Sequence, residues 1–189
     1  SEYMHRTGVT SADLAEFAVL MRANAARHPD AHLRTPITVQ EVLNAKPIAR
    51  PLSLLDCCPI SDGAMALVVS AEPGPQEAVA MVGAGQAHRH QHLTAMADAM
   101  QCGAAEAAQR AFREAGLGLD DVDYLAVYDS FTITLVMLLE EIGFAPRGGA
   151  AQRARRGDFA PTGALPLNTH GGLLSYGHCG VAGGLAPAV

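Results

Sequence analysis

The stretch NTHGGLLSYGH, residues 168–178, decides the expected fold and the candidate site of this chain. It runs into a segment, residues 171–184, in which six of fourteen residues are glycine, and this indicates unusual backbone angles or close packing against a ligand or another backbone. The segment lacks the Gly-Lys-Ser/Thr ending of a phosphate-binding loop and the GxGxxG pattern of a dinucleotide site. His178 lies among these glycines. A sharp turn there either aims its imidazole into a cavity or leaves it as a surface histidine in a structural turn.

A second informative stretch is VYDSF, residues 127–131. It falls where a buried strand is expected to pass into a helix, and in α/β proteins ligands gather at the carboxyl ends of strands. Tyr128 and Asp129 are therefore placed for function, with Tyr128 as an acid or hydrogen-bond donor. The alternative is that Asp129 only caps the helix that follows and that Tyr128 packs in the core.

The hydrophobic pattern predicts alternating helices and buried strands over much of the chain. Helices are expected at residues 10–28, 38–44, 104–115 and 131–142. Near-continuous apolar runs predict strands at residues 64–70, 78–85 and 122–128. Thr10 and Thr38 are expected to cap the first two helices, and Asp129 or Ser130 the last one. Strand, helix, strand and helix at this spacing indicate α/β architecture with right-handed crossovers.

Composition and charge exclude several classes of function. The chain of 189 residues is 49% hydrophobic and 17% charged, which is typical of a globular protein, and no apolar run approaches the roughly 18 residues of a spanning helix. Its net charge of −6 argues against nucleic-acid binding and favours a small-molecule ligand or a protein partner. We therefore expect a cytoplasmic protein without membrane contact. The four cysteines show no zinc-binding spacing and are expected to be reduced.

Three histidines and one cysteine are further candidates for a site. His88, His90 and His92 alternate, so on a strand they would share one face, but no acidic residue or cysteine lies near them in sequence. We predict no metal there and a solvated loop instead. Cys179 adjoins His178, yet packing in a tight turn is favoured over a nucleophilic role. Because the chain opens without a methionine and stops soon after the glycine-rich segment, we expect it to be part of a longer polypeptide.

Several motifs jointly resemble those of the thiolases, which condense or cleave acyl-CoA thioesters. Residues 168–172 and 177–178 resemble the asparagine–glycine–glycine and glycine–histidine block of that family. Residues 61–67, SDGAMAL, resemble its aspartate–glycine–alanine strand, and residues 128–131 stand at its asparagine–glutamate–alanine–phenylalanine motif. The order and spacing of the motifs also match over nearly the whole chain. The flanking sequences are similar to the lipid-transfer-protein (sterol carrier protein x-like) branch.

The resemblance implies the α/β fold class, in the layered αβαβα arrangement of thiolases, of which this chain is the later part. Residues 1–62 would form a helical loop excursion of that fold. Residues 63–74 would be the last strand of the N-terminal half, and residues 75–189 an incomplete C-terminal half.

For function, the resemblance implies a thiolase-like acyltransferase that makes or breaks a carbon–carbon bond in an acyl-CoA thioester. His178 would stabilise the enolate at the thioester oxygen, and Tyr128 stands where thiolases have the asparagine of that oxyanion hole. Some members of the branch are retro-aldolases that cleave steroid side-chain CoA thioesters, and there Tyr128 and Tyr176 would take or donate the proton of a β-hydroxyl group. A non-catalytic half that binds coenzyme A or a partner subunit is the alternative of another class, because the acyl-accepting cysteine would lie outside this chain.

The resemblance also implies ligands and partners. Cys58, Ser61 and Gly177 are expected to contact coenzyme A, which is bound as the thioester substrate. A homo-oligomer is expected, together with a zinc-ribbon/OB-fold partner protein in the retro-aldolase case.

Overall fold

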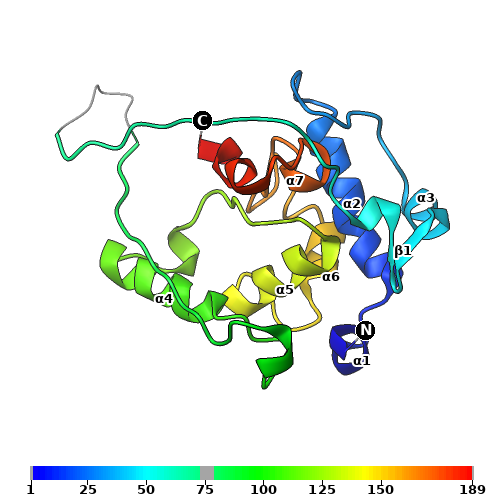
Figure 1. The fold of residues 1–189 in the computed structure, drawn as a ribbon, viewed down its shortest axis with the longest axis horizontal. Coiled ribbons are helices and arrows are strands. Elements are labelled where there is room, and N and C mark those ends of the chain that lie inside the picture. Colours follow the sequence, from blue (N-terminus) through cyan, green and yellow to red (C-terminus); the bar gives the residue numbers. More distant parts are fainter. Residues whose placement is uncertain (1, 73–78, 189) are drawn as a thin grey trace.

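Helix α2 (Ser11–Ala25) is the element against which most other helices pack (Figure 1). The computed structural model describes residues 2–72 and 79–188. The other α-helices are α1 (Glu2–Thr7), α3 (Val39–Asn44), α4 (Ala104–Ala115), α5 (Thr132–Ile142), α6 (Ala150–Arg155) and α7 (Gly172–Ser175). The remaining elements are β1 (Pro47–Ala49), β2 (Leu52–Ser53) and the 3₁₀ helices η1 (Leu54–Asp56), η2 (Leu93–Ala95), η3 (Leu119–Asp121) and η4 (Gly180–Ala188). Within the described ranges, no helix is both long and apolar enough to cross a bilayer.

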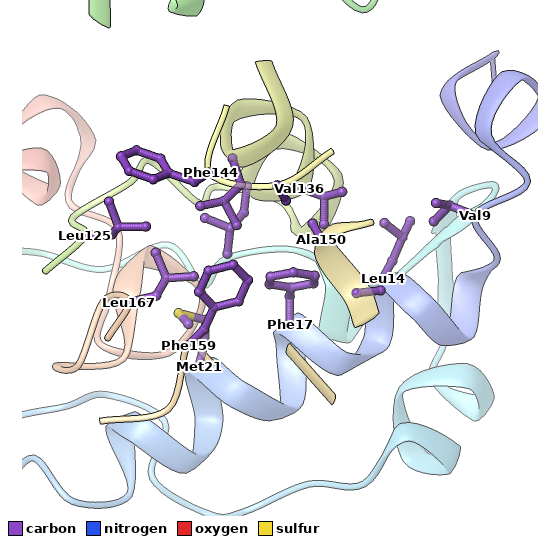
Figure 2. Close-up of a cluster of buried hydrophobic side chains, with 14 of the residues drawn as sticks. Val9, Leu14, Phe17, Met21, Leu125, Val136, Phe144, Ala150, Phe159 and Leu167 are labelled. Atoms are coloured by element: carbon purple, nitrogen blue, oxygen red, sulfur yellow. The ribbon is translucent and has the colours of Figure 1, made fainter. Parts of the chain in front are cut away.

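The main core lies between α2, α5 and α6. Phe17 and Met21 of α2 are fully buried, and the Phe17 ring lies 6.2 Å from the ring of Phe159, centroid to centroid. Figure 2 shows these side chains meeting in one cluster with Val136 of α5. Leu135 and Leu139 of the same helix also belong to this cluster. Burial of each such side chain stabilises the fold by about 1.5–3 kcal/mol, so α2 is held firmly in place.

Polar contacts fix the carboxyl end of α2 against the stretch that carries the NTHGG motif. The guanidinium of Arg22 donates to the Ser175 hydroxyl at 3.2 Å, and the Asn24 amide donates to the carbonyl of Leu167 at 2.9 Å. Gly171, at φ +112°, packs so closely on α2 that a Cβ there would lie 2.5 Å from the Cβ of Ala25. The loop that leads to His178 is therefore positioned by α2.

A capping box begins α2, as the sequence predicts. The Thr10 hydroxyl accepts the N–H of Asp13 at 3.3 Å, and the Asp13 carboxylate accepts the N–H of Thr10 at 2.7 Å. Replacing Thr10 with alanine is expected to lower the free energy of unfolding by about 1 kcal/mol, because one N–H of the first turn loses its partner. Urea unfolding monitored by circular dichroism measures this change. Thr10→Ser should restore most of the loss and Ser11→Ala should change little, whereas equal stability of all three variants would remove the capping interpretation.

The other predicted helices are present with small changes at their ends. Helix α4 spans the predicted residues, and α3 begins after Thr38, which forms a second capping box with Glu41. The expectation that Asp129 or Ser130 caps α5 was wrong, because Phe131 holds the N-cap position and offers no side-chain cap. The Asp129 carboxylate is engaged elsewhere.

The three predicted strands are not formed within the described residues. Residues 64–70 and 79–85 run as an extended arm without strand pairing (residue 78 lies outside the described residues), and the one strand ladder described is the antiparallel hairpin of β1 and β2. Leu125 makes a single parallel bridge with Leu167 in place of the third strand. A strand needs a neighbouring strand for its N–H and C=O groups, and none of the described residues pairs with the arm in this way, although the N–H of Ala84 donates to the Glu114 carboxylate of α4 at 2.9 Å. Its side chains are correspondingly open to solvent, with Val68 96% and Val79 97% exposed, and Figure 1 shows the arm crossing the molecule before it reaches α4.

Candidate active site

Two turns that lie 50 residues apart in sequence meet at the candidate site. The phenol oxygen of Tyr128 lies 3.1 Å from Nε2 of His178. The two rings meet edge to face, with centroids 6.0 Å apart and an interplanar angle of 81°. The structure therefore brings together two of the three residues predicted to be catalytic.

The hydrogen bonds around His178 fix the direction of the contact with Tyr128. The backbone N–H of Gly180 donates to Nδ1 of His178 at 3.1 Å. Because a neutral imidazole with an accepting Nδ1 carries its proton on Nε2, His178 donates to the Tyr128 oxygen. The hydroxyl proton of Tyr128 is then free for a ligand, and 49% of the Tyr128 surface is exposed to receive one.

The backbone of residues 57–61 forms hydrogen bonds with both turns and so links them. The N–H of Cys58 donates to the carbonyl of Ser130 at 3.0 Å, next to an antiparallel bridge between Cys57 and Phe131. At the other end of this segment, the N–H of Ser61 donates to the carbonyl of His178 at 3.0 Å. The segment thus fixes the spacing between the Tyr128 and His178 turns.

The three residues predicted to contact coenzyme A lie along this segment and its neighbour. The Ser61 hydroxyl accepts the N–H of His178 at 3.3 Å and lies 2.9 Å from Nδ1 of His32. Gly177 has φ +147°, and a Cβ there would lie 2.9 Å from the Ser61 hydroxyl, so the turn requires glycine. Burial, together with the nearby Asp129, raises the pKa of the half-buried Cys58 thiol. Contact of these residues with coenzyme A stays a prediction.

Asp129 follows Tyr128 in the sequence and is only 1% exposed. Its carboxylate accepts the N–H of Leu173 at 2.7 Å and that of Leu174 at 3.4 Å. Burial raises the pKa of Asp129 to about 7, although these N–H groups favour the charged form. Asp129 thus caps α7, not the helix that follows it in sequence.

Asn168 clamps the backbone just before Tyr128. Its side-chain oxygen accepts the N–H of Val127 at 2.9 Å, and its side-chain nitrogen donates to the carbonyl of the same residue at 2.8 Å. Asn168 is buried and has φ +43°, a left-handed conformation that asparagine tolerates better than most residues. Sequence reasoning quoted this residue within the NTHGG motif without giving it a role.

Tyr176 is not brought against the other two predicted catalytic side chains. Its ring packs edge-on against His28 and His170, with centroid distances of 5.2 Å to each. Burial, and then the neighbouring His28, lower the pKa of His170 to about 4, so this imidazole is neutral at physiological pH. Nδ1 of His170 is buried without a partner among the described residues. A catalytic role for Tyr176 stays a prediction.

A cavity of about 230 Å³ opens beside Tyr128. Its polar lining comes from Tyr128, Asp129, Asn168 and His170, and Gly183 and Gly184 of η4 form part of its wall. His178 is not among the lining residues and reaches the cavity through its hydrogen bond to Tyr128. That His170 lines the cavity was not predicted from the sequence. Its position in the NTHGG motif was the feature that could have indicated this.

The three alternating histidines and Cys179 do not form a metal site among the described residues. His88, His90 and His92 lie in an irregular segment, so no strand aligns them on one face. Over the part of the chain that is described, no group of three or more His, Cys, Asp or Glu side chains is arranged to hold a metal ion. Cys179 packs on Gly63, where a Cβ would lie 3.0 Å from the cysteine sulfur. This contact supports packing as its function.

Comparison with known proteins finds similarity along nearly the whole chain. Residues 85–189 match the family described as "Thiolase C-terminal domain-like". The chain is 36% identical to the steroid side-chain-cleaving aldolase of Thermomonospora curvata, over 99% of this chain and 50% of that protein. It is 33% identical to the benzoylsuccinyl-CoA thiolase subunit BbsB of Thauera aromatica, over 93% of this chain and 47% of that protein.

A solved structure agrees with these similarities. The Ltp2-ChsH2(DUF35) aldolase superposes with a TM-score of 0.85 at 32% identity, covering 98% of this chain and 51% of that chain. The chain therefore spans about half the length of the curated relatives that it matches.

Proposed function

This chain belongs to the thiolase superfamily, and from that membership we propose that it carries part of an active site that makes or breaks a carbon–carbon bond in an acyl-CoA thioester. Of the reactions in that class, we propose retro-aldol cleavage of a β-hydroxyacyl-CoA. The single observation that carries the site is the Tyr128–His178 hydrogen bond at the edge of the cavity, and the 36% identity to the steroid side-chain-cleaving aldolase favours cleavage over the thiolase reaction. The hydrogen bond supports a tyrosine whose proton is directed to the substrate.

The proposed chemistry begins at the thioester carbonyl. The hydroxyl of Tyr128 donates to the thioester oxygen, and the Nε2–H of His178 stabilises the charge that develops on the phenol oxygen. In the cleavage step the β-hydroxyl loses its proton and the bond between the α and β carbons breaks. The β carbon becomes a carbonyl and the α carbon becomes part of an enolate. Protonation of that α carbon releases the shortened acyl-CoA.

Tyr176, acting as its phenolate, is the proposed acceptor of the β-hydroxyl proton, and it returns this proton to the α carbon after the bond has broken. Its ring packs against His170, which lines the cavity, although Tyr176 itself is not among the lining residues. The neutral imidazole of His170 adds a polar group to this side of the cavity without adding a charge.

Claisen chemistry, which is the thiolase reaction itself, is the second candidate. The similarity to a thiolase subunit, BbsB, favours it. The thiolase reaction needs an acyl-accepting nucleophile, which would come from residues outside this chain. In that case the Tyr128–His178 pair would stabilise the same enolate oxygen during condensation or thiolysis.

We further propose that coenzyme A passes along Cys58, Ser61 and Gly177, and that the intact protein works with a second subunit as well as a second copy of itself. The name of the Ltp2-ChsH2(DUF35) aldolase, which has two components, supports the partner. A zinc-ribbon/OB-fold protein is the proposed kind of partner.

The test compares two substrates with the intact protein that contains this chain. A β-hydroxyacyl-CoA with a tertiary β carbon should give a ketone and a shorter acyl-CoA without added free coenzyme A. A β-ketoacyl-CoA should give little product even when free coenzyme A is present. Tyr128→Phe should lower the cleavage rate by about 10²-fold or more, because the donor to the thioester oxygen is lost. Liquid chromatography of the acyl-CoA products measures both reactions.

Tyr124, a nearby tyrosine that is 40% exposed, provides the matched control, and Tyr124→Phe should leave the rate unchanged. Cleavage that depends on free coenzyme A and survives Tyr128→Phe would replace the aldol proposal by thiolysis. Binding of coenzyme A without either reaction would favour a non-catalytic half.

A further inference from the structure

We propose that Asp129 is a positioning residue, whose buried carboxylate holds the Tyr128 turn against the loop that ends in His178. The role rests on the proposed function, since it acts through the Tyr128–His178 pair. Asp129 follows Tyr128 directly, and its oxygens accept the N–H groups of Leu173 and Leu174 at 2.7 and 3.4 Å. This side chain thus joins the Tyr128 turn to two residues that lie 44 and 45 positions further along the sequence.

The helix that Asp129 caps leads directly into the catalytic turn. Helix α7 ends at Ser175, two residues before Gly177 and three before His178. A small rotation of α7 would therefore move the His178 imidazole relative to the Tyr128 phenol, which it meets through one hydrogen bond of 3.1 Å and an edge-to-face ring contact. Such displacements matter because catalytic groups act only within a narrow geometry.

The approach of the carboxylate requires glycine at position 172. Gly172 has φ +61°, and a Cβ built on it would overlap Oδ2 of Asp129. Both positions of the GG pair in the NTHGG motif therefore require glycine, each for its own reason. Gly171 packs on α2, and Gly172 makes room for Asp129. This close fit is what makes the carboxylate a specific link between α7 and the Tyr128 turn.

The link depends on the charge of Asp129. Among the described residues, no arginine or lysine donates a hydrogen bond to this carboxylate. The groups that face it are the thiol of Cys58, the amide of Asn168 and, across the same cavity, Tyr128 and His170. The ionised carboxylate accepts from both N–H groups, whereas protonation of one oxygen removes an acceptor site. Burial raises the pKa of Asp129 to about 7, which places the change near neutrality: ionisation strengthens both hydrogen bonds, whereas burying the charged carboxylate lowers the stability of the fold there.

The first experiment measures kcat and KM of the intact protein against pH. In the wild type, kcat should rise with pH with a midpoint near the pKa of Asp129, about 7. Asp129→Asn should lower kcat by about 10- to 100-fold, leave KM within about threefold and remove this rise. Asp123→Asn, an exposed aspartate on the same segment, is the control and should keep the wild-type profile. A wild-type kcat and pH profile in Asp129→Asn would overturn the proposal.

The second experiment needs neither activity nor a variant. Wild-type protein carrying ¹³C at the aspartate carboxyl and at Cζ of tyrosine is titrated by NMR. The Tyr128 signal should shift with the same midpoint as the Asp129 carboxyl. A Tyr128 signal that stays flat while Asp129 titrates would overturn the positioning role, even if Asp129→Asn fails to fold. If the wild type cleaves neither substrate, the proposed function fails, and this titration still decides the role of Asp129.

Discussion

Replacing His178 with alanine is expected to lower kcat for carbon–carbon cleavage by about 10²- to 10³-fold, the range found when one preorganised oxyanion donor is removed. The reason lies in the order of the hydrogen bonds. Gly180 fixes the tautomer of His178, His178 donates to Tyr128, and Tyr128 is left to donate to the substrate. Without the imidazole, the phenol loses the group that stabilises its developing charge. Steady-state kinetics on the intact protein measure the loss.

A double-mutant cycle with Tyr128→Phe makes this prediction specific. Because both side chains share one hydrogen bond, the double variant should be scarcely slower than the slower single variant. His178→Gln retains an amide donor and should recover part of the rate. The exposed His5 is the matched control, and His5→Ala should have no effect. Independent, multiplying losses in the double variant would contradict a shared role.

Replacing Asn168 with alanine is expected to lower the free energy of unfolding by about 3 kcal/mol. Two hydrogen bonds to Val127 are lost, each worth about 1 kcal/mol, and the N–H and C=O of Val127 lose these partners. Alanine also tolerates the left-handed backbone at φ +43° less well than asparagine, which costs about 1 kcal/mol more. Chemical denaturation of the intact protein measures the change.

Two further variants separate these contributions. Asn168→Gly relieves the backbone cost but not the lost hydrogen bonds, so it should be less destabilising than alanine. Asn44→Ala, at an exposed asparagine in α3, should change the stability by less than about 0.5 kcal/mol. If Asn168→Ala unfolds at the wild-type denaturant concentration, Asn168 does not clamp the Tyr128 turn.

The parts of the fold that depend on near neighbours in sequence were predictable. The caps of Thr10 and Thr38 find their partners three residues away, so the starts of α2 and α3 can be read from the sequence. The thiolase-like fold, inferred from the order of the motifs, is confirmed by a TM-score of 0.85 with the Ltp2-ChsH2(DUF35) aldolase. The prediction of three strands was wrong because an apolar run indicates that a segment is buried, but does not identify the element that buries it. No paired neighbour for the arm exists among the described residues.

Some features of the candidate site could also be predicted from the sequence, and others could not. The juxtaposition of Tyr128 and His178 followed from the family resemblance, since no local pattern links residues 50 positions apart. Asp129 was predicted either to act in the site or to cap the helix that follows it. Its actual partners are backbone N–H groups, which every non-proline residue has, so nothing in the sequence of Leu173 or Leu174 reveals the contact. For Tyr176 the family motif was a poor guide to position. The residue matches the motif, but its side chain does not lie against Tyr128 or His178.

The exposed arm, residues 64–70 and 79–85, is an aggregation hazard wherever nothing covers it. Val68, Val69 and Val79 present β-branched side chains to water beside a backbone without ladder partners, and such an edge is a template on which other chains add strands. Covering this edge therefore competes with aggregation, and any form of the protein in which the edge stays uncovered should aggregate more readily than one in which it is covered.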